Sequence, residues 1–74
     1  NPVVQRCQIH KERNIRGCLS KRHHPELARL FKRLRNAEGA EAAREALADI
    51  RNSLSGVSSR ALGSLEEAGE ELIA

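Results

Sequence analysis

The spacing of apolar residues between positions 25 and 36 constrains the fold of this chain more than any other feature. Leu27, Leu30, Phe31 and Leu34 recur at intervals of three, one and three. This spacing places all four side chains on one face of an α-helix. Arg and Lys occupy much of the remaining surface of the same stretch. The pattern predicts an amphipathic helix over 25–36, with these four residues at the centre of a core.

Three further stretches have helical periodicity, over about 8–19, 40–54 and from 58 or 59 to the end. Their expected buried residues are Cys7, Ile9, Ile15, Cys18 and Leu19, then Ala43, Leu47, Ile50 and Leu54, then Leu62, Leu65, Ala68, Gly69, Leu72 and Ile73. Gly56 is expected as a left-handed cap, and Ser58 or Ser59 as the start of the last helix. Phe31 is the single aromatic residue, so close-packed aliphatic helices must form the core. We therefore predict an all-α fold, a small bundle of three to four helices.

The first seven residues carry a different signal. Pro2, Val3 and Val4 form a short β-branched run that would suit a buried parallel strand but has no partner strand in this sequence. We expect 1–7 to be an extended segment belonging to a larger core, and otherwise to fray or to lengthen the first helix. With 74 residues and no initiator Met, we expect one piece of a longer protein, in which 8–74 form a helical region.

Charge is distributed unevenly along the chain. Residues 1–35 hold ten Lys or Arg against two Glu, a net +8, whereas 36–74 hold three Arg against eight acids, a net −5. Such a chain either pairs its two halves or offers the basic half to a polyanion. The absence of stacking aromatics argues against single-strand and RNA-binding modules. The candidates for contacts with the DNA backbone are Arg6, Lys11, Arg13, Arg29, Lys32, Arg33 and Arg35.

Cys7, His10 and Asn14 would lie in a row along one helix. One interpretation is a small buried thiol beside a surface histidine. A second is a zinc site completed by Cys18 and by His23 or His24, but a continuous helix would separate the two cysteines by about 16 Å. A third, nucleophilic catalysis by Cys7, lacks any accompanying motif. We expect no metal in this chain and no catalytic residue.

Other ionisable residues point to no further chemistry. Glu66, Glu67, Glu70 and Glu71 would follow one another along a single helix, as a solvated face does, whereas two-metal sites need carboxylates from separate elements. Two cysteines are too few for a disulfide scaffold and suggest reduced thiols in a cytoplasmic protein. No signal peptide or membrane span is recognisable.

The stretch from Arg6 to Asn14 reads R-C-x-x-H-K-x-R-N. It resembles a block in Mutator-type insertion-sequence transposases that follows the second catalytic aspartate. Residues 21–23, 45–49 and 56–72 fit the same family, so the resemblance spans nearly the whole chain. It identifies Cys7 and His10 as a family signature near the active site, and 1–7 as a strand of a ribonuclease-H-like core. The catalytic Asp-Asp-Glu triad would lie outside this sequence.

The resemblance implies a function for the parent protein, namely metal-dependent strand cleavage and transfer at transposon ends, with Mg²⁺ bound by the triad. This chain would be the helical insertion that packs on the catalytic core and contacts the DNA backbone. The expected partners are double-stranded DNA and the rest of the transposase chain, with self-association as a further expectation and no membrane. The expected location is the bacterial cytoplasm, at the nucleoid during transposition. The alternative is a non-catalytic helical module for protein interaction or oligomerisation.

Overall fold

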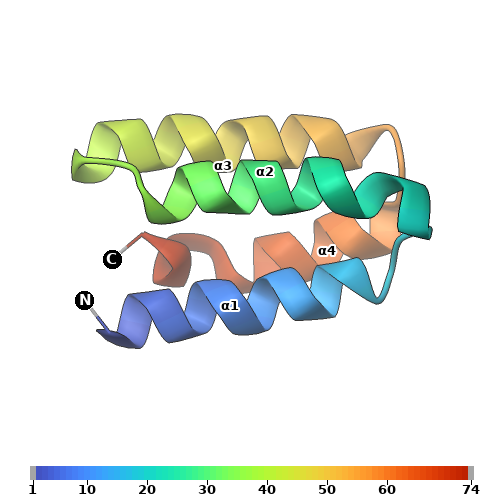
Figure 1. Cartoon of the computed structure of the whole chain (residues 1–74), viewed down its shortest axis with the longest axis horizontal. Coiled ribbons are helices and arrows are strands. Elements are labelled where there is room, and N and C mark those ends of the chain that lie inside the picture. Colours follow the sequence, from blue (N-terminus) through green and yellow to red (C-terminus); the bar gives the residue numbers. More distant parts are fainter. Residues whose placement is uncertain (1, 74) are drawn as a thin grey trace.

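Four α-helices joined by short connections make up the described part of the chain (Figure 1). The computed structural model describes residues 2–73, and the side chains of 3–73. The elements in order are α1 (Pro2–Arg16), η1 (Lys21–His23), α2 (His24–Arg35), α3 (Gly39–Ser55), α4 (Ser59–Ala68) and η2 (Gly69–Leu72). No strand occurs within this range. The prediction of an all-α bundle is confirmed.

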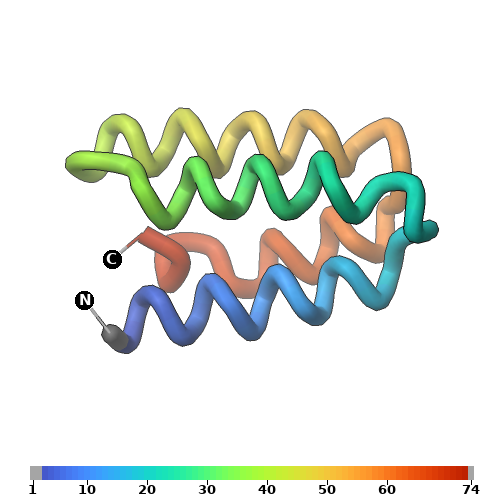
Figure 2. The backbone as a smooth tube through the Cα atoms, in the orientation of Figure 1, coloured from blue at the N-terminus to red at the C-terminus, as the bar shows by residue number. Residues whose placement is uncertain are grey.

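The helices run alternately up and down, and each lies beside two others (Figures 1 and 2). Helix α1 packs against α2 and α4, and α3 packs against the same two helices. Helices α1 and α3 are therefore diagonal to each other. The turn η2 folds back against α1, so the start of α1 and the end of the described chain lie at the same end of the bundle (Figure 2).

The core has the composition expected from the apolar stripes. Leu27, Leu30, Phe31 and Leu34 of α2 are all buried, which confirms the predicted stripe. Helix α3 buries its four predicted residues together with Ala46. Helix α4 and η2 contribute Ala61, Leu65 and Leu72 to the buried set, while Leu62, Ala68 and Ile73 pack partly buried against it. Phe31 is completely buried and so has no surface to offer a ligand.

Helix α1 departs from the expected pattern. Ile15 is buried and Cys7 is partly buried, but Ile9 is 48% exposed, so its predicted place in the core is wrong. The inward positions between them hold Gln8 and Glu12, which are buried polar residues. Positions 8, 12 and 15 share a helical face, whereas position 9 lies about 100° away from position 8. The inward face of α1 is therefore largely polar.

For residues 1–7 the expectations included an extended core segment and a longer first helix, and from Pro2 onward the structure has the longer helix. The first turns of α1 begin at Pro2, while Asn1 lies outside the described residues. Proline is tolerated in the first turn of a helix, since the amide hydrogen it lacks would have no helical partner there. Val3 and Val4 have no neighbouring strand in the described chain, and within the helix their carbonyl oxygens can accept hydrogen bonds from amides four residues further on.

The predicted cap at the start of α4 is confirmed, whereas the predicted cap at the end of α3 is not. The Ser58 hydroxyl accepts a hydrogen bond from the Ala61 amide at 3.1 Å, so Ser58 is the cap of α4. The predicted left-handed conformation at Gly56 is wrong, because its φ is −98°. The left-handed region is occupied instead by Gly39 (φ 89°) and Gly69 (φ 50°). At Gly69 this backbone reversal ends α4 and lets η2 bring Leu72 into the core.

Candidate nucleic-acid interface

The outward face of α1 carries basic and polar side chains that have no partner inside the described chain. Arg6, His10 and Arg13 are exposed, and their helical positions lie opposite the buried residues Gln8 and Ile15. Within residues 3–73 none of the three side chains makes a hydrogen bond or ion pair. This face is free to contact another molecule.

The two signature residues face different surroundings. Cys7 packs partly buried against the core, whereas His10 and Asn14 are exposed. Cys18 lies two residues beyond the end of α1, with its thiol 3.5 Å from the Asn14 carbonyl oxygen. No group of three or more His, Cys, Asp or Glu side chains within the described residues is arranged to hold a metal ion. The structure therefore brings Cys7 and His10 together only as neighbours along one helix.

The seven candidates for DNA contact divide into two groups. Four have partners within the chain: Lys11 donates to the Ser64 hydroxyl at 3.3 Å, Arg29 pairs with Glu26 at 2.6 Å, Arg33 pairs with Asp49, and Arg35 pairs with Glu12 at 2.8 Å. Arg6, Arg13 and Lys32 are exposed, and no ion pair joins them to described residues. Sequence alone did not separate these groups, since the pairing depends on which helices meet.

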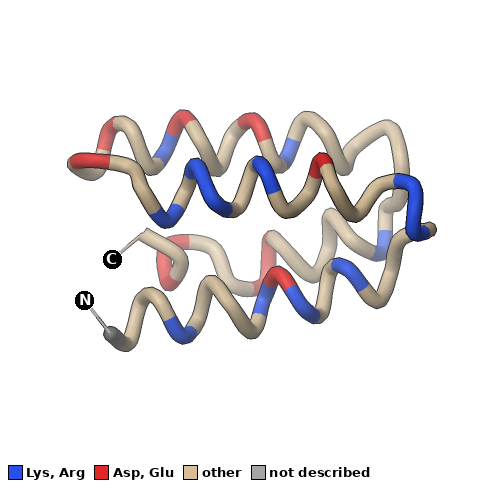
Figure 3. Tube along the Cα trace, viewed as in Figure 1, with Lys and Arg blue, Asp and Glu red and all other residues tan. Residues whose placement is uncertain are grey.

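The basic and acidic halves of the sequence form two separate layers of the bundle. We call residues 2–35 (α1, η1 and α2) the basic layer and residues 36–73 (α3, α4 and η2) the acidic layer. In Figure 3, Lys and Arg follow α1 and α2, and acidic residues gather on α3 and toward the end of the chain. Among the described residues, Arg33–Asp49 is the only ion pair that joins the two layers. The acidic layer therefore leaves most of the basic layer unneutralised.

Both glutamates of the basic layer are engaged by arginines of the same layer. Glu26 is exposed and accepts two hydrogen bonds from Arg29, one turn along α2. The hydrogen bond from Arg29 lowers the pKa of Glu26 below its ordinary value, and Glu26 in turn raises the pKa of Arg29. This pair contributes little to stability, because both groups are exposed to water.

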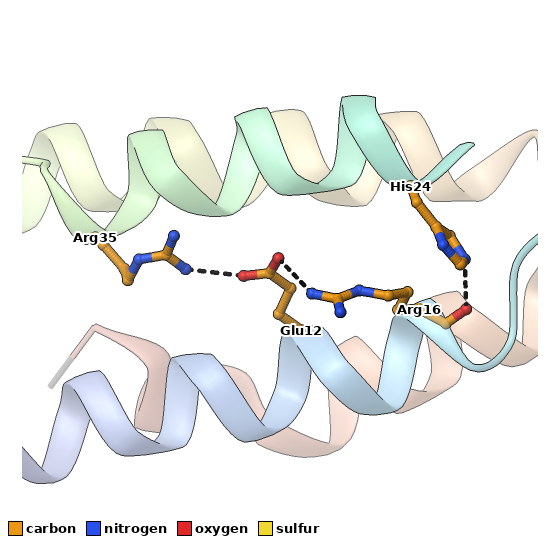
Figure 4. Close-up of polar contacts among 4 residues, drawn as sticks. All are labelled: Glu12, Arg16, His24 and Arg35. Atoms are coloured by element: carbon orange, nitrogen blue, oxygen red, sulfur yellow. Dashed lines mark hydrogen bonds and ion pairs between the residues drawn. The ribbon is translucent and has the colours of Figure 1, made fainter. Parts of the chain in front are cut away.

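Glu12 is in a different situation, and its role was missed from the sequence. The residue is only 7% exposed. One carboxylate oxygen pairs with Arg16 at 3.1 Å and the other with Arg35 of α2 at 2.8 Å (Figure 4). A buried carboxylate needs such partners, since an unpaired charge away from water is costly. The available signal was its helical position, four residues after Gln8 and three before Ile15.

Two other polar residues, His24 and Gln8, make contacts at the two ends of α1. The ring atom Nε2 of His24 lies 3.0 Å from the Arg16 carbonyl oxygen and 3.2 Å from that of Leu19, at the end of α1. Because both partners are acceptors, this nitrogen must carry the proton. At the other end, Gln8 donates from Nε2 to the Leu72 carbonyl oxygen at 2.7 Å, while its Oε1 is buried without a partner among the described residues.

Gln8 also lines an open cleft of 390 Å³ at the end of the bundle where α1 begins. Apolar side chains from three other elements form much of its wall, among them Leu34, Ala43 and Leu72. The cleft wall thus combines apolar side chains with polar ones, among them Gln8 and Arg35. Among the helices of the described residues, none has the length and apolar character needed to cross a membrane.

The sequence matches a known protein family over its whole length. The family model described as "Transposase, Mutator family" matches residues 1–74. No curated protein and no solved structure matches the chain. The matched region covers the entire sequence, including the Cys7–Asn14 block and all four helices. The chain therefore belongs to the Mutator family of transposases.

Proposed function

We propose that this chain is the helical insertion region of a transposase, and that its basic layer contacts the backbone of double-stranded DNA while the bundle packs on the catalytic core. The observation that carries the proposal is the separation of charge into two layers. If the acidic half served to neutralise the basic half, ion pairs between layers would be numerous. Within the described residues there is one, between Arg33 and Asp49.

The chemistry of the basic layer suits phosphate rather than bases. Phosphate contacts need Lys or Arg side chains that reach solvent, and Arg6, Arg13 and Lys32 do so without internal partners. Base stacking needs an exposed aromatic ring, and Phe31, the one aromatic residue, is completely buried. We therefore expect binding to duplexes that is weak and indifferent to sequence.

Contact with the catalytic core is proposed for the cleft beside Gln8. A neighbouring segment of the transposase would cover the apolar side chains of the cleft wall, among them Leu34, Ala43 and Leu72. For the longer protein we propose Mg²⁺ held by an Asp-Asp-Glu triad outside this sequence. The residues present here do not form such a site, since the described chain has no converging cluster of metal ligands, and we assign them no step in strand transfer.

The DNA contact is tested by titrating a fluorescent duplex with the protein at several salt concentrations. Replacing Arg6 and Arg13 with Ala should weaken binding to every duplex equally. It should also reduce the slope of log affinity against log salt by about 0.9 for each phosphate that the variant no longer neutralises. The control is Arg44→Ala with Arg51→Ala, which removes the same charge from α3, diagonal to α1, and also breaks the exposed Arg51–Glu66 ion pair.

The expected result is a clear loss of affinity for the α1 variant and a much smaller loss for the α3 variant. Equal losses would mean that net charge alone governs binding, and that no face is dedicated to DNA. A wild-type protein that binds no duplex even at low salt, but forms a stable dimer, would replace the proposal with a self-association module.

A further inference from the structure

Glu12 links the two helices of the basic layer in a way that an isolated ion pair does not. Its two oxygens are used by two arginines from different helices, Arg16 on α1 and Arg35 on α2. Figure 4 shows the carboxylate between the two guanidinium groups, in the seam where these helices meet. One negative charge thus holds two positive charges, and the cluster keeps a net charge of +1.

The two arginines remain available to a ligand. Their side chains are 48% and 32% exposed, whereas that of Glu12 is 9% exposed. A guanidinium has five N–H donors in a planar fork. Each arginine gives one hydrogen bond to Glu12, so donors are left on the solvent side of the seam. The sequence analysis did not name Arg16 as a candidate for DNA contact. It named Arg35 but did not predict its pairing with Glu12.

Two unpaired cations of the basic layer lie one turn away from the arginines of this cluster. Arg13 is three residues before Arg16, and Lys32 is three residues before Arg35, so each lies on the adjacent turn of the same helix. Both are exposed. Arg16 and Arg35 therefore border the α1–α2 seam with the carboxylate buried between them, while Arg13 lies on the outward face of α1 and Lys32 lines a groove between α2 and α3.

We propose that Glu12 is a positioning residue that holds Arg16 and Arg35 as a paired binding site for phosphates of the DNA backbone. This inference rests on the proposed function and goes further by locating the site at the α1–α2 seam. Fixing a guanidinium before binding reduces the conformational entropy that the complex must lose. Without Glu12 the two like charges would repel each other and turn apart into solvent.

The test compares two effects on DNA affinity that act in opposite directions, the added positive charge and the loss of arginine positioning. Glu12→Gln raises the net charge by one, which on electrostatic grounds alone strengthens binding to DNA. If Glu12 positions the arginines, this variant should bind about tenfold more weakly, which corresponds to the loss of one hydrogen bond to a charged group. The salt slope should also fall by up to about 1.8, for two phosphates. The matched control, Glu26→Gln, adds the same charge on α2 at an exposed pair and should bind slightly more tightly.

Circular dichroism melts establish that each variant is folded at the titration temperature. A second variant, Arg16→Lys, leaves Glu12 and the net charge intact but removes the planar fork, and should weaken binding while Arg44→Lys does not. If Glu12→Gln binds as tightly as Glu26→Gln, or if Arg16→Lys binds like the wild type, the paired site is refuted. Salt-dependent binding by the wild type would then still support the proposed function, whereas no binding by the wild type would refute both.

Discussion

Helices α1 and α3 lie diagonally across the same core and are held there by different forces. Helix α3 buries five apolar side chains and no polar residue. Helix α1 buries a single apolar residue, Ile15, together with Gln8 and Glu12. Apolar burial has no preferred direction, whereas hydrogen bonds and ion pairs fix register and orientation. Helix α1, which carries the family signature, is therefore positioned mainly by hydrogen bonds and ion pairs. Helix α3 is positioned mainly by the burial of apolar side chains.

The largest expected effect comes from the part of the core that all helices share. Phe31→Ala should cost about 3–5 kcal/mol, since the ring is fully buried. This is a large fraction of the free energy of unfolding of a small domain. Chemical denaturation followed by circular dichroism measures it, with Phe31→Leu as a control that should cost much less. A midpoint unchanged by Phe31→Ala would mean that the ring does not contribute to the core.

The polar attachment of α1 is tested by removing its central carboxylate. Glu12→Ala should cost about 1–3 kcal/mol, because it removes hydrogen bonds between charged groups and leaves Arg16 and Arg35 facing each other. Glu26→Ala breaks an exposed pair and should leave the denaturation midpoint unchanged within error. Equal midpoints for the two variants would show that the Glu12 contacts do not help to hold α1 in the bundle.

Two glycines of the acidic layer provide a smaller contrast. Gly69→Ala should destabilise by about 1–3 kcal/mol, because φ is +50° there and a Cβ would meet no compensating neighbour. Gly63→Ala, within α4 and equally free of neighbours, should instead stabilise by about 0.5–1 kcal/mol. Thermal melts of both variants measure whether each substitution lowers or raises the stability. A stabilising Gly69→Ala would mean that η2 does not require the left-handed backbone.

Much of this fold follows from apolar spacing, and the exceptions have physical causes. The four-residue stripe of α2 and the stripe of α3 are periodic and apolar, so their helices and buried faces were predictable. On α1 the period is the same but Gln8 and Glu12 occupy inward positions. Their burial depends on Leu72 and Arg35, which are 64 and 23 residues away. Periodicity within one helix contains no information about such partners.

The candidate interface was predictable in outline and not in detail. Counting charges located the basic half correctly. It did not separate Arg6, Arg13 and Lys32, which have no ion pair within the described chain, from Arg33 and its partner Asp49, because that distinction depends on how α2 lies against α3. Backbone reversals were also misplaced. Gly56 and Gly69 are both plausible caps, and the folding of η2 onto α1 determines which of them adopts positive φ.

The central claim, that the basic layer is the face presented to DNA, is tested most directly by nuclear magnetic resonance. A ¹⁵N-labelled sample of the chain would be titrated with a short duplex, and the shift of each backbone amide recorded. The account predicts shifts concentrated in α1, η1 and α2, largest around Arg13, Arg16 and Lys32, with α3 nearly unchanged. Shifts centred on α3 and α4, or none at low salt, would contradict it.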